Sequence, residues 1–370
     1  MATQITVNGL WERVGRGGAV EFVELCPATN LIPEAPRFVY GTFGAELSAA
    51  YFRNTHLWGM GIYRLHGFDV LGGHGLCKDG DLFCCHEANI HPKHIEDLVA
   101  KIGPPNVPRR RRFLTGQVAM ITGPGHTIYG HWLSDFLPKV YLLQASGHDI
   151  RSLRYLLPAD TPAFGLAWMN LIGIPPENII AIDPTGEMIW VEELLVPTTF
   201  HNGVRASILL SDAAGFLLSC IADRAGEPIG ALARRRVFVS RARASQSRSL
   251  QNRERIEEMA AAAGLEMVYP EGMPLLDQVR LFGEASMIFG EYGSALHGSL
   301  FSPAGTVIGA LRGSLGHPGF IQSGFGHALR QPTGYVFGET DTRIADGRFV
   351  VAEQAFADCL ATLLGGAEFE

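Results

Sequence analysis

A short stretch near the start of the last third of the chain constrains the fold most. Met287–Phe289 is an apolar run typical of a buried strand, and Gly290 and Gly293 follow it directly. Ser294–Phe301 then has helical spacing, and a second apolar run begins at Thr306. Strand, glycine turn, helix and strand in this order predict a βαβ unit of a parallel sheet. Because such a turn lets the helix start receive an anion, the stretch predicts a phosphorylated ligand such as a nucleotide.

Length and composition narrow the class of protein. A chain of 370 residues is long enough for two domains with separate cores, and 47% hydrophobic with 18% charged residues is globular composition. A net charge of −7 argues against a dedicated nucleic-acid binder. Six cysteines are too sparse for a disulfide scaffold, and the first residues lack the pattern of a signal peptide. No apolar run approaches the ~20 residues that span a bilayer, so we expect a cytoplasmic protein, soluble or peripheral at the inner membrane.

The patterns along the chain predict an α/β fold. Residues 1–115 are expected to form an irregular β-rich region that belongs to the first domain, with turns at clusters of glycine and aspartate. Residues 116–205 and 206–350 alternate predicted strands with helices of about 10 to 15 residues, which indicates parallel sheets with both faces covered. Residues 351–370 contain a last predicted helix that packs back on the domains.

The expected elements of these two domains are short and regularly spaced. In the first domain we predict helices at His131–Ala145 and Ala163–Leu171. We predict strands at Val118–Ile121, Arg154–Leu157, Ile179–Ile182 and Glu193–Val196. In the second domain, before the stretch described first, we predict helices at Ser207–Ala225, Arg253–Ala263 and Pro274–Glu284 and strands at Arg236–Ser240 and Glu266–Tyr269.

Two side chains at the start of the helix at His131–Ala145 could carry chemistry. His131 and Asp135 are four positions apart and share one face of that helix, after a glycine-rich approach. Such a carboxylate could remove a proton from an acceptor hydroxyl, with the imidazole orienting it or contacting phosphate. The alternative is that Asp135 makes a local cap or salt bridge and His131 is a core residue.

Arginines follow a predicted strand of the second domain. Arg241, Arg243 and Arg248 lie in the loop after Arg236–Ser240. Ligands of open parallel sheets bind beyond the carboxyl ends of the strands, and the planar arginine fork suits phosphate. The loop therefore predicts phosphate contacts beside the glycine turn, with a solvated loop of surface arginines as the alternative.

A cluster of cysteine and histidine residues in the first domain is a weak candidate for a metal site. Cys84, Cys85 and His86, with His91 and His94 nearby, invite a zinc interpretation, but their spacing matches no common closed site and adjacent cysteines are awkward ligands for one ion. We therefore expect no metal.

The stretch from Pro104 to Arg112 contains a proline-rich part and four consecutive arginines. The arginines could contact nucleic acid or anionic lipid, but a solvated run beside a connector is favoured. No Gly-x-Ser-x-Gly accompanies the candidate residues, which disfavours a serine hydrolase.

Three blocks recur together, in this order, in one known family. Tyr129–Pro138 is similar to a His-Trp-Leu-x-Asp block, and Val239–Arg241 with Arg248–Asn252 is similar to a Ser-Arg and Arg-x-Ile-x-Asn block. Gly290–His297 is similar to a terminal Gly-x-His-Gly-Ala block. The family is glycosyltransferase family 61, which includes many bacterial capsular-polysaccharide proteins. The resemblance covers about residues 120–312.

The resemblance implies a GT-B arrangement of two facing Rossmann-like domains, with the nucleotide-sugar held mainly by the C-terminal one. It implies inverting transfer without a metal cofactor, usually from a UDP-sugar, in bacterial polysaccharide or capsule biosynthesis. In such enzymes helix dipoles and basic side chains can stabilise the departing diphosphate. The implied partners are the nucleotide-sugar donor and a glycan acceptor, with no nucleic acid, and the oligomeric state stays open.

The resemblance also assigns roles to residues of this chain. Asp135 becomes the candidate base, with His131 beside it. The residues expected to bind nucleotide and diphosphate are Arg241, Arg248, Asn252, Gly290, Glu291, Tyr292, Gly293, Ser294 and His297.

Three positions depart from the family pattern. Tyr292 stands where the family often has histidine, His297 where it often has asparagine, and Arg253 where glutamate is common. These departures motivate an alternative, a noncatalytic protein of the same fold that binds a nucleotide-sugar or glycan. A nucleotide-dependent oxidoreductase is disfavoured because no Gly-x-Gly-x-x-Gly follows a strand with an acidic residue ~20 positions later.

Overall fold

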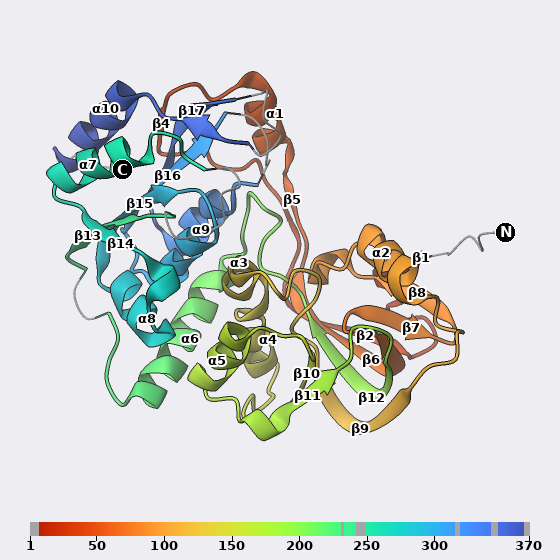
Figure 1. The fold of residues 1–370 in the computed structure, drawn as a ribbon. Helices are drawn as coiled ribbons and strands as arrows, with labels where there is room; N and C mark the ends of the chain where they lie inside the picture. The colour runs from red at the N-terminus through yellow and green to blue at the C-terminus, as the bar shows by residue number, and fades with distance from the viewer. Residues whose placement is uncertain (1–6, 231–232, 242–248, 315–318, 342–346, 366–370) are drawn as a thin grey trace. The chain divides into compact units, whose positions relative to one another are not determined.

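The chain forms two compact units in the computed structural model (Figure 1). The structure describes residues 7–230, 233–241, 249–314, 319–341 and 347–365. Unit 1 is made of Met1–Thr29 and Trp58–Phe200, and unit 2 of Asn30–Leu57 and His201–Glu370. Both units mix strands and helices, so the fold is α/β as predicted. The predicted domain boundaries stay a prediction.

Unit 1 is built on a mixed sheet. Its strands are, in spatial order, β1 (Val7–Gly9), β8 (Asp81–Cys84), β7 (Gly75–Lys78), β6 (Met60–Leu71), β12 (Met188–Pro197), β9 (Arg111–Ala119), β10 (Arg154–Pro158) and β11 (Ile179–Ile182), and β2 (Val20–Cys26) also pairs with β6. β12, β9, β10 and β11 are parallel, because helices connect β9 to β10 and β10 to β11. β6 and β7 are antiparallel across a tight turn, where Gly72 and Gly73 take positive φ.

The helices of unit 1 include the one with the candidate catalytic residues. They are η1 (Trp11–Arg13), η2 (His86–Ala88), α2 (Pro92–Ile102), α3 (Tyr129–His131), η3 (Trp132–Phe136), α4 (Lys139–Ala145), α5 (Ala163–Leu171) and η4 (Pro176–Asn178). The helix predicted at His131–Ala145 is present, but η3 makes a wide π turn in its first half. Such turns are frequent at functional sites.

The four consecutive arginines form the predicted solvated run only in part, because Arg110 is exposed but the next two residues belong to the sheet. Arg111 and Arg112 begin strand β9. Arg111 donates to both carboxylate oxygens of Asp69 at 3.0 and 2.9 Å, and Arg112 donates to both oxygens of Glu187 at 2.7 and 3.0 Å. Both acids are buried, so the arginines neutralise carboxylates of neighbouring segments.

Unit 2 contains a nearly all-parallel sheet. Its strands are, in spatial order, β14 (Glu266–Val268), β13 (Arg235–Val239), β15 (Ala285–Glu291), β16 (Val307–Gly313), β17 (Thr333–Thr340) and β18 (Phe349–Val350), and β4 (Phe38–Tyr40) also pairs with β17. Within this set only β18 is antiparallel to its partner. The predicted βαβ unit is confirmed as β15, the 3-10 helix η6 (Ser294–Phe301) and β16.

Helices cover both faces of this sheet (Figure 1). They are α1 (Ala45–Arg53), α6 (Leu209–Ala225), α7 (Arg253–Ala262), η5 (Pro270–Gly272), α8 (Leu275–Gly283), α9 (Ile321–Leu329) and α10 (Glu353–Leu364). α10 packs on α7, β4 and β17, whereas α6, α8 and α9 contact η6. The two-residue strands β3 (Thr29–Asn30) and β5 (His56–Leu57) complete the described elements. Of the described helices, none combines the length and apolar character that crossing a membrane requires.

Two helical glycines predict opposite effects of the same substitution. A Cβ at Gly165 in α5 would lie 2.3 Å from the buried Trp132 ring, whereas a Cβ at Gly215 in α6 would meet nothing within 4 Å. We expect Gly165→Ala to destabilise by about 1–3 kcal/mol through overpacking, and Gly215→Ala to stabilise by about 0.5–1 kcal/mol. Urea unfolding followed by circular dichroism measures both, and a gain of stability in Gly165→Ala would contradict the packing.

Candidate functional site

A hydrogen-bonded pair marks the carboxyl end of β9 in unit 1. The Nδ1 atom of His131 lies 2.7 Å from Oδ2 of Asp135, and the hydroxyl of Ser134 donates to the same oxygen at 2.7 Å. Asp135 is 3% exposed, whereas the side chain of His131 is 34% exposed. The carboxylate therefore lies behind the imidazole, and the imidazole is the group that a substrate can reach.

The pairing fixes how the imidazole can react. A carboxylate accepts a hydrogen bond, so Nδ1 of His131 carries the proton and Nε2 keeps its lone pair in the neutral ring. Burial lowers the pKa of His131, but the hydrogen bond with Asp135 and the charge of Asp135 outweigh it and raise the pKa above its usual value. The pair can accept a proton at Nε2 and stabilise the imidazolium that results.

The glycine-rich approach holds this imidazole in place. Gly125 has φ of +86°, and a Cβ there would lie 2.6 Å from Cδ2 and 2.8 Å from Nε2 of His131. The neighbouring Trp132 donates from Nε1 to the backbone oxygen of His126 at 2.8 Å, which ties the approach to the helix. Gly125 is thus required both for its backbone conformation and for the close contact with the ring.

A buried lysine, which the sequence analysis did not identify, completes this site. Lys139 is 1% exposed and donates from Nζ to the backbone oxygen of Ala88 at 3.2 Å. Burial lowers the pKa of Lys139 to about 8, while the charges of Asp135 and Cys85 oppose the shift. Its spacing of four from Asp135 on an apolar helix is the sequence signal that could have revealed it.

In unit 2 the carboxyl ends of neighbouring parallel strands bring several predicted residues together. Arg241 follows β13, and Tyr292 and Gly293 follow β15. Nη1 of Arg241 donates to the backbone oxygen of Tyr292 at 3.3 Å, and a Cβ at Gly293 would lie 3.2 Å from the same nitrogen. The arginine therefore lies directly against the glycine turn, as the interpretation of a phosphate site requires.

Arg312, near the end of β16, adds a second positive charge close to Tyr292. It is buried, and its guanidinium carbon lies 4.8 Å from the ring centre of Tyr292 and 4.1 Å from that of Phe320. Its Nη1 atom donates to the backbone oxygen of Gly319 at 2.7 Å. The sequence analysis did not identify Arg312, because the apolar run that begins at Thr306 indicated only a strand.

Two other predicted ligand residues hold the scaffold of unit 2. The buried carboxylate of Glu291 accepts from Nε of Arg253 at 2.6 Å and from the backbone nitrogen of Leu250 at 3.0 Å. Asn252 exchanges two hydrogen bonds with the backbone of Val351, at 2.8 and 3.2 Å. The arginine at position 253 is thus the ion-pair partner of Glu291, which gives this departure from the family pattern a structural role.

The remaining predicted residues take different positions. A Cβ at Gly290 would lie 2.5 Å from the backbone oxygen of Val239, so glycine permits the close approach of β15 to β13. Ser294 begins η6, directly after the turn. His297 is buried, and its Nδ1 lies 2.8 Å from Nε2 of Gln322. Arg248 lies outside the described residues.

The described residues show no metal centre. Cys84 and Cys85 are buried thiols of unit 1, and the sulfur of Cys85 faces the carboxylate of Glu87 at 3.6 Å. Across the described ranges, no group of three or more histidine, cysteine or acidic side chains is arranged to hold a metal ion.

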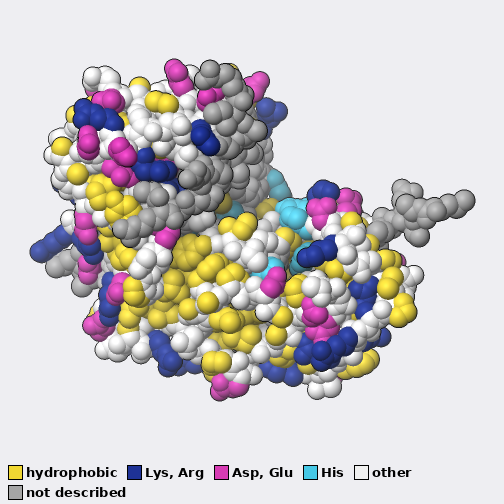
Figure 2. All heavy atoms as spheres, viewed as in Figure 1, with side chains coloured by type: hydrophobic (Ala, Val, Ile, Leu, Met, Phe, Trp, Pro, Cys, Tyr) yellow, Lys and Arg dark blue, Asp and Glu magenta, His cyan; other side chains and the backbone are white. Residues whose placement is uncertain are grey.

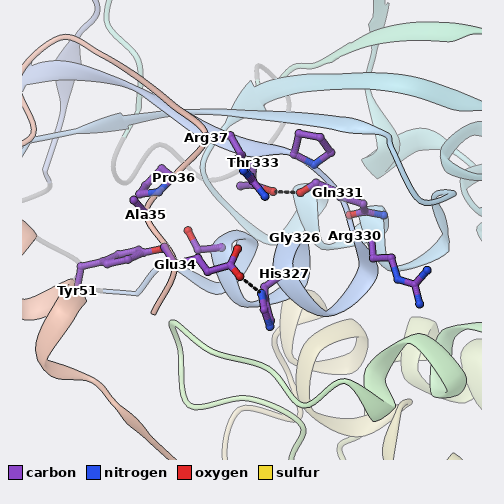
Figure 3. Close-up of a pocket in the computed structure, with 12 residues that line it drawn as sticks. Glu34, Ala35, Pro36, Arg37, Tyr51, Gly326, His327, Arg330, Gln331 and Thr333 are labelled. Atoms are coloured by element: carbon purple, nitrogen blue, oxygen red, sulfur yellow. Dashed lines mark hydrogen bonds and ion pairs between the residues drawn. The ribbon is translucent and has the colours of Figure 1, made fainter. Parts of the chain in front are cut away.

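A cavity of about 350 Å³ opens elsewhere in unit 2, where α9 ends and β17 begins (Figure 3). Glu34, Arg37, His327 and Thr333 are among the residues that line it, and Nδ1 of His327 lies 3.2 Å from a carboxylate oxygen of Glu34. Strand β17 begins at this end, so the cavity lies opposite the carboxyl edge of the sheet. None of the predicted site residues is among those that line it.

The fold and these contacts define the class of protein: an α/β protein with a histidine–aspartate pair in one unit and a basic sheet edge in the other. The family model for glycosyltransferase 61 matches residues 129–309, which include the blocks at Tyr129–Pro138 and Gly290–His297. This match confirms the resemblance to glycosyltransferase family 61 and indicates glycosyltransferase activity. A search of curated proteins gave no match.

The ion pair between Arg253 and Glu291 generates a stability prediction. We expect Arg253→Met to destabilise the chain by about 2–3 kcal/mol, because it leaves the Glu291 carboxylate buried without its cation. This loss of stability is smaller than the loss expected for a fully buried ion pair, because the Arg253 side chain is 21% exposed. The double variant with Glu291→Met removes both charges and should recover most of the loss.

Urea denaturation of the single and double variants measures both effects. A double variant that is less stable than Arg253→Met would contradict the assignment of the loss to an unpaired buried charge.

Proposed function

We propose that this glycosyltransferase is a metal-independent inverting enzyme that moves a sugar from a UDP-sugar to a hydroxyl of a glycan acceptor. The family match supports glycosyl transfer, and the observation that carries the mechanism is the partly exposed ring of His131 with the buried Asp135 behind it. The proposal includes a GT-B arrangement in which unit 1 takes the acceptor and unit 2 the nucleotide. A role in bacterial capsule or polysaccharide synthesis and a cytoplasmic, peripheral location are parts of the same proposal.

In the proposed reaction His131 is the base. Its Nε2 removes the proton of the acceptor hydroxyl while that oxygen attacks the anomeric carbon of the donor. The bond from the anomeric carbon to the diphosphate breaks on the opposite face, so the configuration inverts and the diphosphate leaves with the electron pair. Asp135 orients the ring and stabilises the imidazolium. These roles reverse the sequence-based assignment of Asp135 as the base, because the 3% exposed carboxylate lies behind the ring.

The departing diphosphate gains negative charge and needs positive partners. Arg241 beside the glycine turn supplies one of them, and the nearby Arg312 makes the same edge more positive. Tyr292 contributes a neutral side chain, whose hydroxyl accepts from the backbone nitrogen of Ile321 at 3.2 Å. Arg248 remains a predicted phosphate ligand. In this scheme Asn252, Glu291 and His297 shape the site and do not contact the diphosphate.

Substitutions in the two units separate catalysis from nucleotide binding. We expect His131→Gln to lower kcat for transfer by about 10²–10⁴-fold, with UDP affinity unchanged, because only the base is lost. We expect Arg241→Ala to weaken UDP binding by about 10–100-fold, because a charged hydrogen-bond donor is lost. Transfer and donor-hydrolysis assays measure the first effect and calorimetry with UDP the second. His148→Asn, elsewhere in unit 1, is the matched control.

Unchanged turnover in both variants would overturn the assignment of these residues. UDP binding by the wild-type chain, without transfer or donor hydrolysis across a panel of nucleotide-sugars, would favour the noncatalytic binding protein instead.

The pH profile tests the charges around Asp135. Transfer needs neutral His131, whose pKa is raised above its usual value, so activity is present above that pKa and falls as pH drops through it. We expect a second fall above about pH 8, because Lys139 then loses the charge that offsets Asp135. Lys139→Met should remove the alkaline fall and move the acid limb to higher pH, since the positive charge that offsets Asp135, the partner of His131, is gone.

The exposed Lys93→Met is the matched control and should keep the wild-type profile. An alkaline limb that persists in Lys139→Met would show that another group causes it.

A further inference from the structure

Three further histidines surround the start of α2, beside the helix that carries His131. They are His86, His91 and His94, named here the imidazole cluster. Nζ of Lys139 donates to the backbone oxygen of Ala88 within this segment. The charge of His131 also contributes to lowering the pKa of His94, so the two rings lie within electrostatic reach. Figure 2 shows histidine side chains close together on the face in view.

The cluster is connected by hydrogen bonds. Nδ1 of His86 lies 2.8 Å from Nδ1 of His91, and Nε2 of His91 lies 3.1 Å from the side-chain oxygen of Asn89. Because that oxygen accepts, Nε2 of His91 carries its proton and His86 donates to Nδ1 of His91. This arrangement leaves Nε2 of the exposed His86 outside the network, where protonation makes it a charged donor.

We propose that the imidazole cluster is an acceptor subsite that binds an anionic group, either a sugar carboxylate or a phosphate, next to the base His131. The inference rests on the proposed function, because it names the kind of acceptor that unit 1 would hold. Neighbouring imidazoles that are joined by hydrogen bonds can take up additional protons and so become positively charged. A bound anion stabilises this positive charge, so such a cluster binds an anion well.

The charges around the cluster come from imidazoles and from two carboxylates. Burial lowers the pKa of His91 and of His94; neighbouring imidazoles add to this effect, and Glu87 and Asp97 oppose it. Asp97 is paired with Lys93 at 2.6 Å, and Asp160 with His126 at 2.8 Å. Outside the cluster itself, the charged groups that act on His91 and His94 are Glu87 and Asp97 of the same segments and His131 of the neighbouring helix, and His94 also faces His74. An anion therefore enters a region in which Asp97 already has a cationic partner and Glu87 acts on His91.

The start of α2 allows substitutions that remove imidazoles and keep the helix. The side chains of His91 and His94 each accept a bond from the other residue's backbone, which forms a capping box. Asparagine is a good helix cap, and glutamine at the third position preserves a capping box. The triple variant His86→Gln, His91→Asn, His94→Gln therefore tests the cluster, and His148→Asn controls for the loss of an imidazole.

Nuclear magnetic resonance of the imidazole C–H groups tests binding directly. Glucuronate or inorganic phosphate, added to the full chain, should produce saturable shifts and raise the pKa of the cluster, with tighter binding as pH falls from about 7.5 to about 6. The triple variant should bind about tenfold more weakly. Equal shifts with sodium chloride at matched ionic strength, or unchanged binding by the variant, would overturn the proposal.

Transfer kinetics test the role as an acceptor subsite. With methyl glucuronide, a sugar phosphate and methyl glucoside as acceptors, the triple variant should lose about tenfold in kcat/KM for the acidic acceptors alone and keep donor hydrolysis. A preference for the carboxylate or for the phosphate identifies the source of the anionic group. Equal losses for acidic and neutral acceptors would overturn the subsite, whereas a wild-type chain without transfer or hydrolysis would overturn the proposed function instead.

Discussion

The hydrogen bond between His131 and Asp135 is the interaction on which the candidate site depends. A carboxylate as buried as Asp135 is costly unless hydrogen bonds and positive charge surround it, and Ser134 and Lys139 supply them. The packing of Trp132 against Gly165 fixes the turn that carries both residues. The chemistry of unit 1 therefore follows from one buried charge and the groups that stabilise it.

In unit 2, as in unit 1, a buried charge needs partners, and this requirement distinguishes scaffold residues from residues that can face a ligand. Glu291 is buried and has Arg253 and a backbone amide as partners, so it holds the segment before α7 against β15. Arg241 instead lies at the carboxyl edge against the glycine turn. Burial and pairing thus distinguish residues that the resemblance assigned together to the nucleotide site, and the departure at position 253 becomes part of the scaffold.

Much of the secondary structure could be predicted from local patterns. The glycine turn between β15 and β16, the strands β13 and β14 and the helix at α7 follow from periodicity and spacing, which depend on neighbours in the sequence. Strand β4 could not be predicted, because a three-residue strand has no period and its partner β17 is about three hundred residues away. Arg111 and Arg112 were misread for a related reason: their acidic partners come from distant segments.

The sequence by itself determined the resemblance to the family, the spacing of His131 and Asp135 on one helical face, and the glycine turn at Gly290–Gly293, because all of these reside in short segments. Only the tertiary structure decided which member of the histidine–aspartate pair meets the substrate, which arginines reach the sheet edge, and that Lys139 lies buried beside Asp135. The physical reason is that exposure and pKa depend on the atoms packed around a group, and distant parts of the chain supply most of those atoms.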